Sequence, residues 1–90
     1  MKVKRAGLID VLTRDGETAV LVDGHILRLS VLGAAMLELT ADWVDVEVLA
    51  GELGDRFGAP ADRTSWEATV EAIADMVRNG VLVTAPTASG

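Results

Sequence analysis

The first third of the chain alternates apolar and polar residues and is interrupted by two turn signals. Asp15-Gly16 and Asp23-Gly24 are two-residue sequences typical of type I′ hairpin turns, in which both central residues adopt positive φ. Two such turns in succession predict three antiparallel strands. These strands are expected at about residues 8–13, 18–22 and 25–29. The pattern therefore predicts a three-stranded antiparallel meander.

Two type I′ turns also fix the register of this sheet. Arg14 is expected to face Glu17, and the other predicted pairs are Val11 with Val20, Val20 with Leu27, and Val22 with His25. One face is then apolar and is predicted to be the core side: Ile9, Val11, Val20, Val22, Leu27 and Leu29. The opposite face is mixed: Leu8, Asp10, Leu12, Ala19, Leu21, Ile26 and Arg28.

Three helices are predicted after the meander, each from a start signal and apolar residues at helical spacing. The expected N-caps are Ser30, Asp45 and Thr64, the last forming a capping box with Glu67. The helices are predicted from about 31 to 40, from 46 to a stop at Gly58, and from 65 to Asn79-Gly80. Residues 81–83 are expected to be extended. We predict a single domain over residues 1–84 and a flexible tail over residues 85–90.

The apolar spacing also predicts which helix faces are buried. In the first helix these residues are Val31, Leu32, Ala35, Met36 and Leu39, and in the second Val46, Leu49, Ala50, Leu53 and Phe57. In the third helix they are Trp66, Val70, Ile73, Ala74 and Val77, opposite a charged face of Glu67, Glu71, Asp75 and Arg78. A flank of uncharged residues remains on the third helix: Ser65, Thr69, Ala72 and Met76. This flank either packs on the sheet or in a dimer, or it forms the wall of a binding groove.

The composition of the chain disfavours or excludes several classes of function. A domain of 90 residues needs most of its apolar residues for folding, which leaves little room for an elaborate active site. The chain has no cysteine, so disulfides and thiolate sites are excluded and a reducing compartment is compatible. The net charge of −6 disfavours nucleic acid as the main partner. Asp10 interrupts the apolar residues near the start, so neither a signal peptide nor a membrane span is predicted. We expect a cytoplasmic protein.

The sequence offers few residues that could form a catalytic or metal site. His25 is the only histidine, and its place beside a hairpin turn favours a role as cross-strand partner of Val22. The acidic residues Asp42, Asp45 and Glu47 lack the glycine and the ligand series of a calcium loop. We therefore predict no enzymatic activity, no metal site and no cofactor.

Three stretches of the chain carry a resemblance to a known family: LRLSVLGAAMLEL at 27–39, VEVLAGELGDRFG at 46–58 and VEAIADMVRNGVLV at 70–83. Together they resemble the PqqD-like proteins, the peptide-recognition elements of ribosomal peptide natural-product pathways. The sequence departs from the family pattern at Ser30, where an asparagine is usual. The connection ADWVDV also replaces a common segment that contains Asp-Gly.

The resemblance implies an α+β winged helix-turn-helix fold, with a three-stranded antiparallel meander followed by three helices. It also implies that the leader segment of a precursor peptide binds as an added strand beside the third strand, and that a separate modifying enzyme or leader peptidase then acts on it. The peptide-binding residues implied are Ile26, Leu27, Arg28 and Leu29 with Thr69, Ala72, Ile73 and Met76. The product class, whether lasso peptide, radical-modified peptide or redox cofactor such as PQQ, stays open.

The same architecture also allows a different function, DNA binding by a transcription regulator. The last helix of a winged helix-turn-helix can lie in the major groove. Here that helix would present Glu67, Glu71 and Asp75 to the phosphates, which is a repulsive arrangement. Peptide binding is therefore the favoured hypothesis and DNA binding the alternative.

Overall fold

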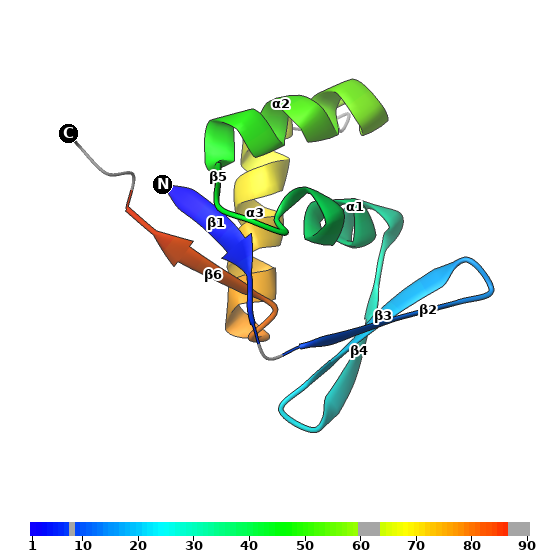
Figure 1. Ribbon diagram of the computed structural model, residues 1–90. Helices are drawn as coiled ribbons and strands as arrows, with labels where there is room; N and C mark the ends of the chain where they lie inside the picture. The colour runs from blue at the N-terminus through cyan, green and yellow to red at the C-terminus, as the bar shows by residue number, and fades with distance from the viewer. Residues whose placement is uncertain (8, 60–63, 87–90) are drawn as a thin grey trace.

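Two small antiparallel sheets and three helices make up the fold (Figure 1). The structure, a computed structural model, describes residues 1–7, 9–59 and 64–86. The strands are β1 (Lys2–Arg5), β2 (Asp10–Arg14), β3 (Glu17–Val22), β4 (His25–Leu29), β5 (Val44–Asp45) and β6 (Leu82–Ala85). The helices are α1 (Val31–Leu39), α2 (Val46–Phe57) and α3 (Ser65–Arg78). The chain is thus mixed α+β, as predicted.

The predicted meander is present as the sheet β2-β3-β4. Its register is the expected one: Arg14 pairs with Glu17, Val20 pairs with both Val11 and Leu27, and Val22 pairs with His25. The central residues of both turns have positive φ, from 48° at Asp23 to 79° at Gly16, as type I′ turns require. Leu8, which was assigned to the first strand, lies outside the described residues.

A second sheet, with the strand order β5-β1-β6, corrects the predicted order of elements. β1 pairs with β5 and with β6, so segments from the two ends of the described chain lie side by side (Figure 1). The sequence KVKR did not predict this strand, because it contains a single apolar residue between charged neighbours. That residue, Val3, is wholly buried. Ala85, assigned to the tail, pairs with Lys2. Residues 87–90 lie outside the described part of the chain.

The helix starts follow the predicted caps with one difference. The Oγ atom of Ser30 accepts a hydrogen bond from the amide of Gly33 at 3.1 Å. The capping box of Thr64 and Glu67 is formed in both directions. Asp45 stands at the N-cap of α2 with extended backbone, but its side chain accepts no capping hydrogen bond. Gly58 follows α2 with a φ of 73°, a value that favours glycine.

The core lies between the helices, β1, β3 and β6. Its members are Val3, Val20, Val22, Ala35, Met36, Leu37, Val46, Leu49, Leu53, Ile73, Met76, Val81 and Leu82. On α1 and α2, two residues predicted to be buried are instead exposed, Val31 by 76% and Phe57 by 45%. Val11 is also 41% exposed, because the β2–β3 hairpin projects away from the helices (Figure 1).

The prediction of the buried face of α3 is wrong: the face that is buried is rotated about the helix axis from the predicted one. Thr69, Ile73 and Met76 are the buried residues, whereas Trp66 is 47% exposed and Val77 is 38% exposed. Ala74, also assigned to the core, is exposed. The cause is the close approach of α2. A Cβ atom added at Gly54 would lie 3.1 Å from the Oγ atom of Ser65, so the side of α3 with small residues forms the contact.

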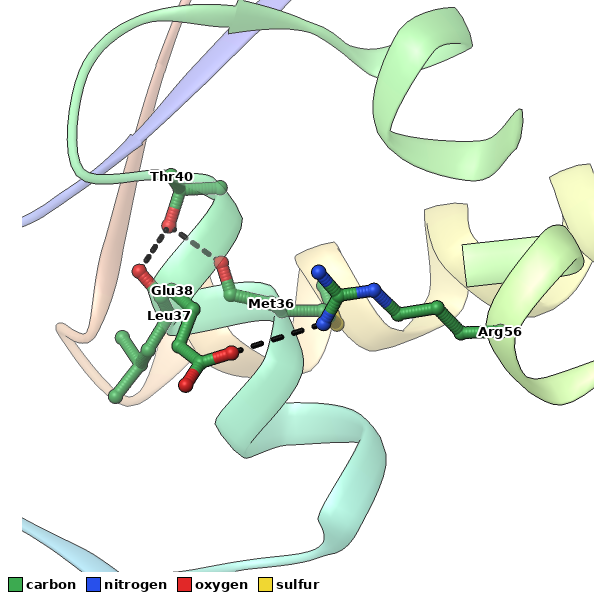
Figure 2. Close-up of polar contacts among 5 residues, drawn as sticks. All are labelled: Met36, Leu37, Glu38, Thr40 and Arg56. Carbon is green, nitrogen blue, oxygen red and sulfur yellow. Dashed lines mark hydrogen bonds and ion pairs between the residues drawn. The ribbon is translucent and has the colours of Figure 1, made fainter. Parts of the chain in front are cut away.

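The end of α1 is held by polar contacts (Figure 2). The hydroxyl of Thr40 donates to the carbonyl oxygen of Met36 at 2.7 Å. Near the same end, a guanidinium nitrogen of Arg56 on α2 lies 3.6 Å from a carboxylate oxygen of Glu38. Because both charged side chains are partly exposed, this ion pair contributes little stability and mainly marks where α2 crosses α1.

Candidate functional site

The strand β4 is an edge of the sheet β2-β3-β4 among the described residues. Val22 and His25 flank a type I′ turn and therefore form a hydrogen-bonded pair, and such pairs alternate along the ladder. The backbone groups of Ile26 and Arg28 consequently point away from β3. An edge strand of this kind can accept a further strand.

The four predicted site residues on β4 divide between the two faces of the sheet. Ile26 is 67% exposed, and Arg28 lies on the same outer face with its side chain near a carboxylate oxygen of Glu17, at 3.8 Å. Leu27 and Leu29 are half-buried and pack against the core. The strand therefore offers its open edge to solvent while its inner side chains fix it to the body of the protein.

The four predicted site residues on α3 are mostly in the core. Thr69 and Ile73 are each 2% exposed and Met76 is 7% exposed, so these three side chains are not surface groups. Ala72 is half-buried and packs at the margin of the core. Of the four, Ala72 is the one with a partly exposed side chain.

A cavity lies between the β3–β4 hairpin and the C-terminal end of α3. We call it the hairpin cavity; its volume is about 320 Å³. It is lined by Val22, Asp23, His25, Leu27, Val77, Arg78, Asn79 and Gly80. Arg78 donates to the carboxylate of Asp75 at 3.2 Å, which draws its charge toward the solvent side of α3. The hairpin cavity thus combines an apolar floor with a polar rim.

A second cavity, the helix cavity, lies where α1, α2 and α3 meet. It has a volume of about 230 Å³ and is lined by uncharged residues: Leu32, Leu53, Gly54, Phe57, Gly58, Ala59, Ser65, Ala68 and Thr69. Sequence reasoning missed this cavity because it assigned Phe57 to the core. The one signal pointing to it was the run of small residues on the flank of α3.

The two cavities lie at opposite ends of α3. The hairpin cavity contains the first residue of β4, His25, and the end of α3. The helix cavity contains Leu32, which follows β4 in the chain, and the start of α3. β4 and α3 therefore come together at the hairpin cavity, whereas at the helix cavity the start of α3 meets α1 and α2.

The described residues contain no cluster of three or more histidine, cysteine, aspartate or glutamate side chains that could hold a metal ion. Within the same residues, no helix has the length and apolar character needed to cross a membrane.

Comparisons with known proteins add no assignment. The chain matches no family model, no curated protein and no solved structure.

Proposed function

We propose that this chain is a non-catalytic, cytoplasmic protein that binds the leader segment of a ribosomally made precursor peptide. The leader adds as a strand to the open edge of β4, and the attached core peptide is presented to a separate modifying enzyme or leader peptidase. The proposal includes a winged helix-turn-helix fold, in which the sheet β2-β3-β4 is the wing. No cofactor takes part.

The observation that carries the proposal is the open edge of β4, whose inner-face residues His25 and Leu27 line the hairpin cavity with the C-terminal end of α3. Main-chain hydrogen bonds to the outward groups of Ile26 and Arg28 would supply affinity that does not depend on the peptide sequence. The neighbouring cavities would accept side chains and supply specificity. Leu27 and Leu29 keep the edge in place through their contacts with the core, so little order has to be created on binding.

Ala72 is the α3 residue that best fits the wall of such a site. It lies one helical turn after Ala68, on the side of α3 that lines the helix cavity. Ile73 and Met76 support the wall from within the core, and Thr69 would be reached only by a peptide side chain that enters the helix cavity. The site proposed on α3 is therefore smaller than the resemblance implies.

The alternative of DNA binding is disfavoured by the surface of α3. Its exposed residues include Glu67, Glu71 and Asp75, whose carboxylates would repel phosphate groups. Arg78 is the basic residue of this helix, and it is already paired with Asp75. We therefore keep peptide binding as the conclusion.

The test uses fluorescently labelled synthetic peptides that cover the N-terminal halves of short reading frames next to the gene. Anisotropy titration is compared for the parent, Ala72→Glu and Ala74→Glu. The two variants carry the same charge change on the same helix, but residue 74 is exposed. Ala72→Glu should weaken binding by ~1–2 kcal/mol because a carboxylate loses water beside apolar groups. Ala74→Glu should bind as the parent does.

Two outcomes would contradict the proposal. One is that none of the peptides binds the parent protein, while a gel shift with duplex DNA is positive. The other is that Ala72→Glu and Ala74→Glu bind equally well while both remain folded by circular dichroism.

A further inference from the structure

The sheet β2-β3-β4 has a second edge, formed by β2. All five residues of β2 are exposed, among them Val11 by 41% and Leu12 by 51%. The hairpin that carries this strand projects away from the helices (Figure 1). Within the described residues, β2 is thus a strand with two exposed apolar side chains, solvent on both faces and one unpaired edge. Such an edge is a template for pairing with another chain.

The register of the hairpin fixes which backbone groups β2 offers. Arg14 and Glu17 flank the type I′ turn and form a hydrogen-bonded pair, so Arg14, Leu12 and Asp10 bond to β3. The amide and carbonyl groups of Val11 and Thr13 therefore point to the free edge. A partner strand has to bond to these two residues.

The sequence of β2, DVLTR, is complementary to itself when read in the opposite direction. In an antiparallel pairing about a two-fold axis at Leu12, each Asp10 lies opposite Arg14 of the second copy. Leu12 lies opposite its own symmetry mate, and Val11 lies opposite Thr13. The last pair exchanges the hydrogen bonds, which agrees with the groups that the hairpin leaves free. Leu12 and the charged pairs then occupy the positions where side chains of opposite strands come closest.

The charges select this register over its neighbours. Among the described residues, neither Asp10 nor Arg14 takes part in an ion pair. Moving the axis by one residue to Val11 places Asp10 opposite Leu12, and moving it to Thr13 places Arg14 opposite Leu12. Both shifts lose the two ion pairs and leave a charge beside an apolar side chain.

We propose that β2 is a self-association edge, through which two copies of this chain form a symmetric dimer with a continuous six-stranded sheet. The interface is isologous and closes on itself, so β2 does not template a fibre. Five residues from each copy form a small interface, so the dimer is reversible and depends on concentration. The β4 edges lie at the two ends of the extended sheet and stay open. The inference does not depend on what β4 binds.

The main test exchanges the charges and measures mass by sedimentation velocity over a range of concentrations at low salt. Asp10→Arg alone and Arg14→Asp alone each place like charges opposite one another, and each should raise the dimer dissociation constant at least ~10-fold. An equimolar mixture of the two variants should form a heterodimer, since every pair is then opposite in charge. The double variant Asp10→Arg/Arg14→Asp should dimerise as the parent does.

A charge-matched control separates this effect from net charge. Asp55→Arg changes the net charge from −6 to −4, as Asp10→Arg does, at an exposed position on α2. It should leave the dissociation constant unchanged. Weakening by Asp55→Arg equal to that by Asp10→Arg would overturn the proposal, because repulsion between whole molecules would then explain the result.

Cysteine cross-linking tests the axis directly, since the chain has no native cysteine. Leu12→Cys should form an intermolecular disulfide on mild oxidation, because residue 12 faces itself at a spacing that a disulfide can bridge. Thr13→Cys is the control, since residue 13 faces residue 11 and should cross-link poorly. A parent chain that stays monomeric at millimolar concentration, a species larger than a dimer, or equal cross-linking of both variants would overturn the proposal.

Discussion

The hydroxyl of Thr40 donates a hydrogen bond to the carbonyl oxygen of Met36 at 2.7 Å. The backbone amide of Thr40 donates to the carbonyl oxygen of Leu37 instead, at 3.4 Å. Thr40 is wholly buried, and its own carbonyl oxygen accepts the amide of Arg5 at 2.9 Å. One residue therefore ends α1 and joins it to β1, the strand at the centre of the second sheet.

Replacing Thr40 by valine should destabilise the fold by ~1–3 kcal/mol, since the shape is kept but a buried carbonyl loses its partner. Thr40→Ser keeps the hydroxyl and loses only a methyl group, so it should cost less. Urea unfolding followed by circular dichroism measures both changes. Equal stability of Thr40→Val and the parent would show that the hydrogen bond contributes nothing.

Gly80 lies between α3 and β6 with a φ of 77°, and a Cβ atom there would lie 3.3 Å from Cγ2 of the buried Val22. Gly80→Ala should therefore combine the strain of positive φ, about 1–2 kcal/mol, with the cost of a tight contact.

Gly16 provides the matched control. Its φ is 79°, but nothing lies within 4 Å of an added Cβ atom. Gly16→Ala should cost only the backbone term, so thermal unfolding should show a smaller loss than for Gly80→Ala. Equal losses of melting temperature in the two variants would mean that the side chain of Val22 moves away from the added methyl group without cost.

Met76 and Val77 are neighbours on α3 with opposite environments, the first 7% and the second 38% exposed. Met76→Ala should lower the free energy of unfolding by ~2–4 kcal/mol through the cavity it leaves. Val77→Ala should lower it by less than about 1 kcal/mol. The reverse order in chemical denaturation would restore the buried face expected from the sequence alone.

Prediction from the sequence succeeded where a local rule decides the outcome. The Asp-Gly turns alone determine the register of the meander, because positive φ at both central residues leaves one hairpin geometry. The capping box at Thr64 is equally local. β1 was not predicted because its pairing with β5 and β6 joins segments that are distant in the sequence. Its one apolar residue, Val3, also forms no recognisable strand pattern.

Where the predicted site residues lie in the fold could be derived from the sequence for β4 but not for α3. The residues of β4 follow from the hairpin, and the structure leaves Ile26 and Arg28 at the open edge. The residues of α3 depend on which side of that helix meets α2, and the small residues around Gly54 decide this. A hydrophobicity pattern ranks Trp66 above Thr69 for burial, whereas the close approach of the helices reverses the order.

The last prediction concerns the open edge of β4 and rests on the proposed peptide binding. Proline lacks the amide hydrogen, so it removes one donor from whichever side of the strand it occupies. Leu27 pairs with Val20 in the ladder, so Leu27→Pro should destabilise the fold strongly. The amide of Arg28 points away from β3, so Arg28→Pro should remain folded with a smaller fall in melting temperature. It should nevertheless lose affinity for an added strand.

Arg28→Ala completes the comparison because it removes the side chain and keeps the amide. A leader peptide should bind Arg28→Ala nearly as well as the parent and Arg28→Pro much more weakly, in parallel anisotropy and thermal unfolding measurements. If both variants bind alike while folded, the strand does not add at this edge. If Leu27→Pro is the better folded of the two proline variants, the outward amides belong to the other residues of β4. The inner and outer faces of the sheet would then exchange, since a shift of one residue reverses every side chain.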